Sequence, residues 1–340
     1  MEEKTVSKED FFEFLAALTK DYQVFAPVKR DDCLVFAQVQ PEDEICLDYH
    51  NTKRGVKEAF FPQREQLFSF NLGNGDEDIT EPSFPDTKRV MFGVRPCDAK
   101  GLFLFDRVFG DKGYEDPYYL SKRANTIVIA LGCSQPESTC FCIDNKGGPF
   151  ATDGSDLLLV DLGDSYSVQV ITEKGEELLK NEDKFRKADQ NQVRLKEEIV
   201  EKARAFLKPS VNPEKAKERL DKNFDDPIWD RLHEKCLGCG ICTFLCPTCH
   251  CFDILDETGG PKGERIRIWD SCMFPQFTLH ASGANPRPTG KERLRQRVMH
   301  KFKYFVDNHG EIACSGCGRC IRYCPVNLDI REILGEIQGQ

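Results

Sequence analysis

Residues 236–247 read CLGCGICTFLCP, and residues 314–325 read CSGCGRCIRYCP. Both stretches have the spacing C-x2-C-x2-C-x3-C-P, in which the first three cysteines bind one [4Fe–4S] cluster and the fourth binds the other. The spacing assigns the ligands of the first cluster as Cys236, Cys239, Cys242 and Cys324, and those of the second cluster as Cys314, Cys317, Cys320 and Cys246. A pair of zinc sites is the alternative, but zinc sites normally use separated C-x2-C pairs. The repeated pattern therefore favours two [4Fe–4S] clusters.

The segment between the two cysteine stretches is too long for the short hairpin that joins the motifs of a compact two-cluster ferredoxin. It contains a helical pattern from Glu292 to Val306. We therefore expect residues 231–340 to form a mainly α-helical dicluster ferredoxin domain. Because no acid–base constellation accompanies the cysteines, the domain is predicted to relay electrons and to have no catalytic residue.

The N-terminal half has the pattern of a mixed α/β domain. Residues 5–20 have the apolar spacing of an amphipathic helix, with Ser7 as the expected capping residue and Asp10 three positions later. Runs that favour strands follow at residues 34–39, 89–94, 126–131, 157–162 and 167–172. We expect this domain to span residues 1–175 and a charged helical connector to span residues 176–230.

One βαβ unit can be followed closely in this domain. Residues 89–94 and 126–131 are predicted strands, and residues 99–109 are the helix between them. Strands joined by a right-handed crossover lie parallel, so their carboxyl ends meet at one edge of the sheet. Cys97 and Cys133, which follow the two strands, are therefore expected near each other.

Two more cysteines follow shortly after Cys133, in the phrase TCFC at residues 139–142. Together these residues form a candidate third metal site, made of Cys97, Cys133, Cys140 and Cys142. The alternative is that they are ordinary buried or free thiols.

Five cysteines lie outside these three sets. Cys249, Cys251 and Cys272 are either packing residues around the clusters or ligands that take a fourth ligand from elsewhere. Cys33 and Cys46 lie in strand-like stretches and are expected in the core. The six histidines have no paired metal-binding spacing, and neither G-x-G-x-x-G after a strand nor G-x-x-x-x-G-K-[ST] occurs. We therefore expect no nucleotide site in this chain.

The composition argues against several other classes of protein. The 340 residues are 40% hydrophobic and 31% charged, and no apolar run reaches the roughly 18 residues of a membrane span. A formal net charge of −10 gives no general attraction to nucleic acid or anionic lipid. The N-terminus lacks the basic and apolar regions of a secretory signal, so we expect a cytoplasmic protein. In that compartment 17 cysteines indicate metal binding rather than disulfides.

Several phrases within and outside the cluster motifs are distinctive. They are GVRPCD (93–98), TCFC (139–142), CPTC (246–249), WDSCMF (269–274), NPRPT (285–289) and GCGRCIRYCPVN (316–327). In these phrases the chain resembles the iron–sulfur β subunits of cytoplasmic hydrogenase/sulfur reductases, the sulfhydrogenases. It is also similar to the A subunits of anaerobic sulfite reductases and to the iron–sulfur subunits of heterodisulfide-reductase-linked flavin oxidoreductases.

This resemblance implies a non-catalytic subunit of a hetero-oligomer in anaerobic metabolism. The subunit would pass electrons between an FAD-containing, NAD(P)H-linked partner and a terminal hydrogenase, sulfite or sulfur reductase, or heterodisulfide reductase, without membrane or nucleic acid. Two alternatives remain from the residues themselves. In one, the N-terminal cysteines are a reaction centre that reduces sulfur or disulfides. In the other, the N-terminal domain is a metal-free docking module that carries the ferredoxin domain.

Overall fold

The computed structural model describes residues 3–30, 33–73, 78–84 and 86–339. The chain divides into two compact units, and neither is a single continuous segment. The first unit comprises Met1–Val56, Asp86–Asn212 and Cys314–Gly318, and the second comprises Lys57–Pro85, Pro213–Ala313 and Arg319–Gln340. The two units are interleaved along the chain, because residues 57–85 belong to the second unit and residues 314–318 to the first.

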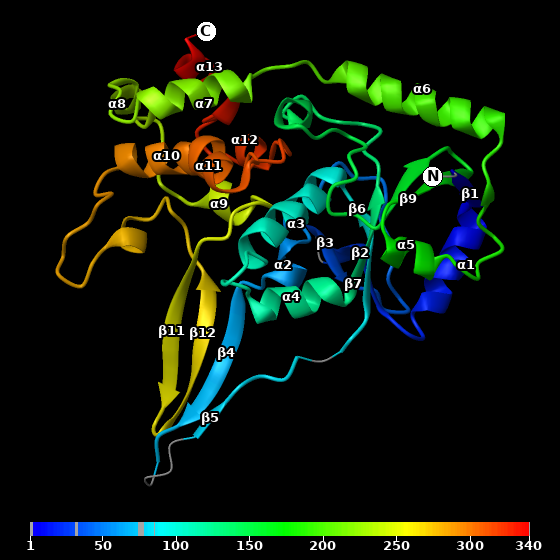
Figure 1. The fold of residues 1–340 in the computed structure, drawn as a ribbon, viewed down its shortest axis with the longest axis horizontal. Coiled ribbons are helices and arrows are strands. Elements are labelled where there is room, and N and C mark those ends of the chain that lie inside the picture. Colours follow the sequence, from blue (N-terminus) through cyan, green and yellow to red (C-terminus); the bar gives the residue numbers. More distant parts are fainter. Residues whose placement is uncertain (1–2, 31–32, 74–77, 85, 340) are drawn as a thin grey trace. The chain divides into compact units, whose positions relative to one another are not determined.

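An eight-stranded sheet forms the centre of the first unit, with the order β10-β1-β9-β8-β7-β6-β2-β3 within the described ranges (Figure 1). Its strands are β1 (Lys4–Ser7), β2 (Gln23–Arg30), β3 (Cys33–Gln38), β6 (Arg89–Val94), β7 (Thr126–Leu131), β8 (Leu157–Asp161), β9 (Ser165–Val170) and β10 (Arg186–Lys187). Strands β2, β6, β7 and β8 are parallel neighbours, and the other pairs are antiparallel. The mixed α/β fold of the N-terminal half is thus confirmed.

The helices of the first unit precede, connect or follow these strands. They are α1 (Lys8–Leu18), α3 (Pro96–Phe109), α4 (Pro117–Ala124), η1 (Cys142–Asn145), α5 (Glu173–Leu178) and α6 (Gln190–Phe206). Ser7 caps α1 as predicted, because its hydroxyl accepts a hydrogen bond from the Asp10 backbone N–H at 3.0 Å. Helix α6 lies in the stretch expected to be helical and charged.

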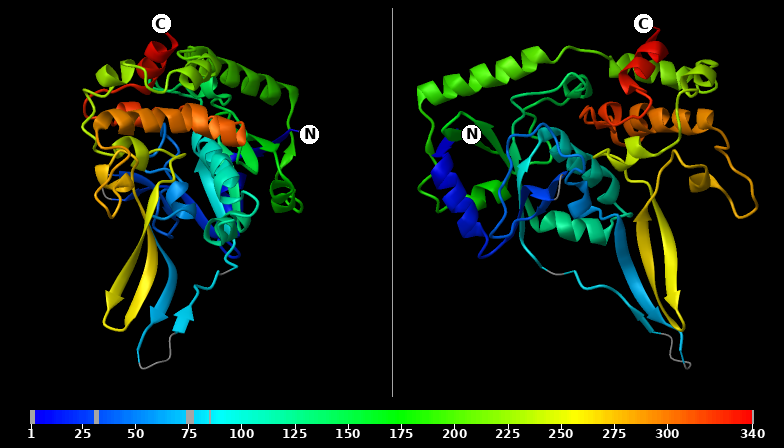
Figure 2. Two further views of the ribbon diagram at one scale, coloured as in Figure 1. Left: turned by 60° about the vertical axis from the view of Figure 1, so that its left-hand side comes forward. Right: turned by 180° about the vertical axis from the view of Figure 1, so that it is seen from behind.

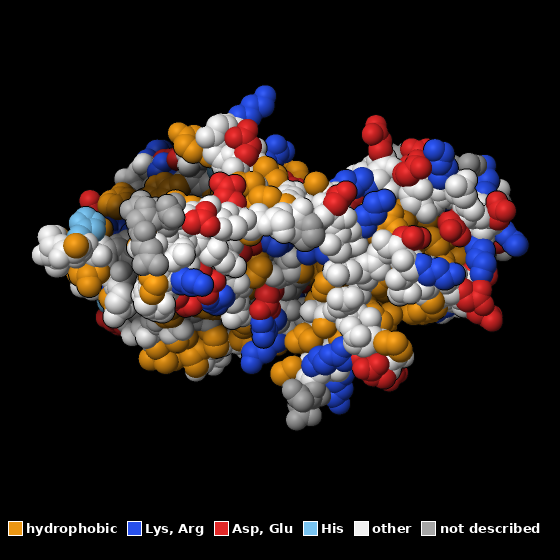
Figure 3. Space-filling view, turned by 90° about the horizontal axis from the view of Figure 1, so that it is seen from below, with side chains coloured by type: hydrophobic (Ala, Val, Ile, Leu, Met, Phe, Trp, Pro, Cys, Tyr) orange, Lys and Arg blue, Asp and Glu red, His pale blue; other side chains and the backbone are white. Residues whose placement is uncertain are grey.

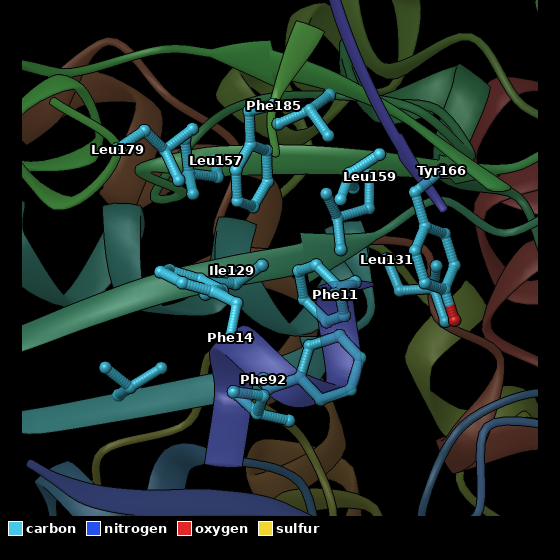
Figure 4. Packing of buried hydrophobic residues seen from close by; sticks show 14 of the residues in the cluster. Phe11, Phe14, Phe92, Ile129, Leu131, Leu157, Leu159, Tyr166, Leu179 and Phe185 are labelled. Atoms are coloured by element: carbon cyan, nitrogen blue, oxygen red, sulfur yellow. The ribbon is translucent and has the colours of Figure 1, made fainter. Parts of the chain in front are cut away.

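A hydrophobic core lies between α1 and one face of the large sheet (Figure 4). Phe11 is fully buried there, with its ring centroid 5.0 Å from that of Phe92 on β6 and 5.2 Å from that of Tyr166 on β9. Burying one such side chain contributes about 1.5–3 kcal/mol. The core therefore fixes α1 across the sheet and holds the strand ends, where the cysteines lie, in place.

Strand β6, helix α3 and strand β7 form the βαβ unit predicted from the sequence, with β6 and β7 parallel. Helix α3 begins at Pro96, three residues before the predicted start. Proline suits the first helical turn because its missing N–H has no partner there in any case. As a result Cys97 lies in the first turn of α3, while Cys133 lies just beyond β7, both at the carboxyl edge of the sheet.

A four-stranded antiparallel sheet belongs to the second unit, with the order β11-β12-β4-β5 among the residues described. Its strands are β4 (Arg64–Asn71), β5 (Asp78–Thr80), β11 (Phe252–Gly259) and β12 (Lys262–Trp269), and Figure 2 shows β11, β12 and β4 side by side. The β11–β12 hairpin was not expected in a mainly helical segment. Nearly all of β11 is exposed, so it lacks the alternation of apolar and polar residues that signals a strand.

The remaining elements of the second unit are helical. They are α2 (Lys57–Phe60), α7 (Pro213–Lys222), α8 (Ile228–Leu232), α9 (Ile241–Phe244), η2 (Pro275–Thr278), α10 (Gly290–Met299), η3 (His300–Tyr304), α11 (Phe305–His309), α12 (Arg319–Arg322) and α13 (Ile330–Gln338). The run α10, η3 and α11 covers the predicted helix at 292–306. It begins at a capping box in which the Glu292 carboxylate accepts a hydrogen bond from the Thr289 N–H at 2.9 Å.

Two further observations concern the helices and the surface. Within the described part of the chain, no helix has both the length and the apolar character needed to cross a membrane. On the face drawn in Figure 3, basic and acidic side chains are interspersed with apolar ones.

Candidate metal centres

The cysteines of the first motif surround a cavity in the second unit. Cys236, Cys239 and Cys242 line it from the loop before α9 and from α9 itself, while Cys320 and Cys324 line it from α12 and the turn after it. The four residues assigned to the first cluster therefore come together, and Cys320 lies beside them. Much of the remaining lining is apolar: Leu237, Ile241, Met273, Leu294, Pro325, Val326 and Leu328.

Backbone amides in this motif point at the thiols. The N–H of Gly238 donates to Cys236 Sγ at 3.4 Å, and the N–H of Leu328 donates to Cys324 Sγ at 3.3 Å. Gly238 has a φ of +67°, a conformation that glycine adopts without steric cost. Hydrogen bonds from amides stabilise thiolates and tune the potential of a cluster that the thiolates hold. Four converging thiols with amide donors and an apolar wall fit a [4Fe–4S] cluster.

The second motif repeats this local geometry. Gly316 has a φ of +65°, and its N–H donates to Cys314 Sγ at 3.4 Å, as in the first motif. Cys314 and Cys317 belong to the first unit, whereas Cys246 and Cys320 belong to the second. The ligand set of the second cluster therefore remains a prediction from spacing.

A buried arginine lies among the thiols of the second unit. Arg297 on α10 is 4% exposed and lines the same cavity as Cys242 and Cys320. Burial opposes its charge, but attraction to the thiolates of these and neighbouring cysteines raises the pKa of the guanidinium above its ordinary value. A permanent cation at this position favours an anionic cluster, because four thiolates give a [4Fe–4S] cluster net negative charge.

A second cavity lies in the first unit, at the carboxyl edge of the large sheet. It is lined by the four members of the candidate third site, Cys97, Cys133, Cys140 and Cys142. His50 and Cys317 line it as well. Neither residue was predicted at the third site, because His50 lies in no motif and the spacing of the second motif assigned Cys317 to the second cluster.

Burial disfavours the thiolate form of three cysteines in this cavity. Burial raises the pKa of both Cys140 and Cys142 to about 12, and it also raises the pKa of Cys133. Thiols of this kind are poor nucleophiles but become thiolates when a metal displaces the proton. His50 Nε2 lies 3.2 Å from Cys140 Sγ. The donor set therefore fits a metal cluster better than a reactive thiol.

Arg95 fixes the loops around this cavity. Its guanidinium is buried and donates to the carbonyl oxygens of His50 at 3.1 Å and Gly132 at 2.9 Å. It also donates to the Tyr49 carbonyl and lies 4.3 Å from the centroid of the Tyr49 ring. The arginine thus joins the loop that contains His50 to the end of β7, next to Cys133.

Three further cysteines lie in the second unit: Cys249 lies beside Cys246, Cys251 lies near Cys249, and the Cys272 thiol is hydrogen-bonded to that of Cys251. The thiols of Cys249 and Cys246 are hydrogen-bonded to each other. Lys301 donates to Cys246 Sγ at 3.4 Å, and Lys57 donates to the Cys249 carbonyl oxygen at 3.2 Å. Burial lowers the pKa of Lys57 to about 8. The Cys249 and Cys251 thiols therefore lie near two buried lysines, and Cys249 lies beside a ligand assigned to the second cluster.

Two cysteines lie outside all of these groups. Cys33 on β3 is exposed, so its expected place in the core was wrong, and Cys46 is half-buried. In the residues that the structure describes, no three His, Cys, Asp or Glu side chains converge closely enough to bind a single metal ion.

Comparisons with known proteins found a family model and a similar protein that cover many of these cysteines. Residues 235–328 match the model of a 4Fe-4S dicluster domain. The chain is 35% identical over 332 residues to a protein named sulfhydrogenase 2 subunit beta from Pyrococcus furiosus, which covers 97% of this chain and 96% of that protein. No solved structure matches the chain.

Proposed function

The chain belongs to the family of iron–sulfur β subunits of sulfhydrogenases, and from this membership we propose that it passes electrons between a flavin-containing, NAD(P)H-linked partner and a terminal catalytic subunit. It is an iron–sulfur electron-transfer subunit with a dicluster domain, and its relative's name is that of one subunit of a larger complex. The proposed terminal partner is a hydrogenase, a sulfite or sulfur reductase, or a heterodisulfide reductase.

The observation that carries this proposal is the convergence of cysteines on two separate cavities. We propose three [4Fe–4S] clusters. The first has the ligands Cys236, Cys239, Cys242 and Cys324, the second has Cys314, Cys317, Cys320 and Cys246, and the third has Cys97, Cys133, Cys140 and Cys142. Three one-electron centres and no nucleotide motif suit a relay that receives and delivers electrons through partners.

The side chains and backbone amides around the thiols would set the reduction potential of a cluster at each site. When bound, a [4Fe–4S] cluster gains or loses one electron, and the reduced form is the more negative. The N–H groups of Gly238 and Leu328 and the charge of Arg297 stabilise negative charge at the first site. At the third site, His50 donates or accepts at Cys140, depending on its tautomer.

The finer details of fold and location belong to the same proposal. We propose that residues 231–340 form a dicluster domain of the α-helical type, with residues 176–230 as the connector. The helical run from Gly290 to His309 between the two motifs supports this. We also propose that the protein acts in the cytoplasm, where reducing conditions keep cysteines available as ligands.

The division of labour can be tested on the anaerobically purified chain. Dithionite should bleach its visible absorption and produce the paramagnetic signal of reduced clusters, whereas NADH and NADPH should leave the clusters oxidised. Addition of a flavin-containing partner subunit should make reduction by NAD(P)H possible. Reduction of the chain alone by NAD(P)H would overturn the proposed relay, because it would require a nucleotide site in this chain.

A further inference from the structure

A cavity of about 780 Å³ lies at the carboxyl ends of the parallel strands of the first unit. Residues at three strand ends reach it: Arg95 follows β6, Cys133 lies just beyond β7, and Asp161 ends β8. Open α/β sheets bind ligands outside the carboxyl ends of their strands, and small-molecule sites have volumes of roughly 300–1,000 Å³. The place and size of this sheet-end cavity are therefore those of a ligand site. The proposed relay makes no use of it.

Aromatic and aliphatic side chains give the sheet-end cavity a wall suited to a flat ligand. Phe12, Tyr49 and Tyr166 contribute rings, and Ile45 and Leu47 contribute aliphatic surface. Phe12 on α1 is 37% exposed, although its neighbour Phe11 is fully buried. An aromatic ring with open surface at the wall of a cavity can stack on a second ring. The lining therefore favours a planar aromatic molecule.

The charged groups of the lining disfavour a phosphate. Lys8 Nζ lies 2.8 Å from the carboxylate of Asp161, and Arg95 already donates to backbone carbonyls. The other charged residues of the lining are Asp48 and Glu137. Acidic side chains thus outnumber basic ones, and both cations are engaged within the protein. An uncharged ligand meets no such repulsion.

The sheet-end cavity adjoins the candidate third metal site. His50, Arg95, Cys133 and Pro136 line both cavities. His50 Nε2 lies 3.2 Å from Cys140 Sγ while the same residue forms part of the larger wall. A molecule in the sheet-end cavity would therefore lie against residues that hold or contact the thiols of the third site.

We propose that the sheet-end cavity binds a planar, uncharged heteroaromatic molecule of the size of an isoalloxazine ring, the ring system of a flavin that lacks its phosphate. The exposed ring of Phe12 supplies stacking surface, and the engagement of Lys8 and Arg95 within the protein selects against phosphorylated forms. The binding itself stands on the cavity. Its relevance to electron transfer rests on the proposed function, because only a cluster at the third site would give the ligand a redox partner.

The binding can be measured with riboflavin as the probe, by equilibrium dialysis against the full-length, anaerobically purified protein. We expect saturable binding of one riboflavin per chain and weaker binding of flavin mononucleotide, which differs by its phosphate. Phe12→Ala should weaken riboflavin binding roughly two- to tenfold through loss of one aromatic contact. Phe206→Ala is the matched control, because Phe206 is also exposed but lies on α6 outside the cavity lining. This variant should bind riboflavin with unchanged affinity.

A second variant tests the cavity without removing any packing. Ser134 is exposed and lines the cavity, so Ser134→Trp should place an indole in it and weaken riboflavin binding at least about tenfold while the protein stays folded. Absence of saturable binding to the wild type, or equal binding by Ser134→Trp, would overturn the proposal.

Iron is counted in the same samples. Riboflavin binding with about 8 iron atoms per chain would uphold this site and refute the third cluster, whereas about 12 iron atoms without binding would do the reverse.

Discussion

Replacing Gly316 by alanine tests how closely the second cysteine motif approaches the backbone of the third site. Gly316 has a φ of +65°, and a Cβ built on it would lie 2.5 Å from the backbone N and Cα of Cys142. The neighbouring Phe141 N–H donates to the Gly316 carbonyl oxygen at 2.9 Å. An added methyl group must therefore push two backbone segments apart and break this hydrogen bond.

Gly238→Ala is the matched control, because Gly238 occupies the equivalent position in the first motif. Its φ is +67°, but the nearest atom to an added Cβ is the Met273 carbonyl oxygen, 3.6 Å away. Both substitutions cost about 1–2 kcal/mol for the left-handed conformation. Gly316→Ala adds about 1–3 kcal/mol for overpacking and about 1 kcal/mol for the lost hydrogen bond. The expected difference between the variants is about 2–4 kcal/mol.

The assay is the rate at which an iron chelator bleaches the visible absorption of the anaerobic protein. If the chelator reaches clusters through local opening, the rate follows the free energy of that opening. Since each 1.4 kcal/mol is a factor of about ten, Gly316→Ala should lose absorption at least about tenfold faster than Gly238→Ala. Equal rates for the two variants would refute the inferred contact between residues 314–318 and the loop at Cys142.

Three further substitutions have distinct expected outcomes. Arg297→Gln should lower the reduction potential of the first cluster by roughly 90 mV in a redox titration, since a unit charge at ~8 Å and an effective dielectric of ~20 is worth about 2 kcal/mol. Lys291→Gln, on the same helix outside the cavity, should leave the potential unchanged. Phe11→Ala should lower the free energy of unfolding of the first unit, measured in urea, by about 3–5 kcal/mol. Phe206→Ala, at an exposed position, should change this free energy by less than about 0.5 kcal/mol. Equal changes in the two variants would contradict the described core. Burial lowers the pKa of His300 from 6.5 to about 3, so the unfolded chain binds a proton that the folded protein does not, and stability should fall as the pH drops from 6.5 towards 3. His300→Gln should reduce the loss between pH 6.5 and pH 5 by up to about 2 kcal/mol, and an unchanged pH dependence would show that His300 is not buried as a neutral ring.

Local patterns in the sequence were sufficient where the chemistry is local. Ligand spacing singled out Cys236, Cys239 and Cys242, because three cysteines on one loop can hold a cluster only at certain intervals. The crossover rule brought Cys97 and Cys133 to one edge of the sheet, because parallel strands end on the same side. The three cysteines predicted from ligand spacing line the cavity in the second unit, and the two predicted from the crossover rule line the cavity in the first unit.

Long-range pairing left no comparable signal. Strand β4 pairs with β12, which follows it by nearly two hundred residues, and their exposed neighbour β11 lacks a buried face that would mark it as a strand. Lys57 reaches the Cys249 carbonyl across a similar separation. Cys317 shares a cavity with the third site, although the spacing of its own motif assigns it elsewhere. Such contacts depend on tertiary packing rather than on the residues adjacent in the chain.

The most direct test of the proposed relay is the amount of iron and acid-labile sulfide per chain in anaerobically purified protein. Three [4Fe–4S] clusters predict about 12 of each per chain. The double substitution Cys140→Ser with Cys142→Ser should lower both to about 8, and Cys33→Ser, which changes an exposed cysteine outside every site, should leave them at about 12. About 8 of each in the wild type would contradict the third cluster, and zinc in place of iron would contradict the electron relay itself.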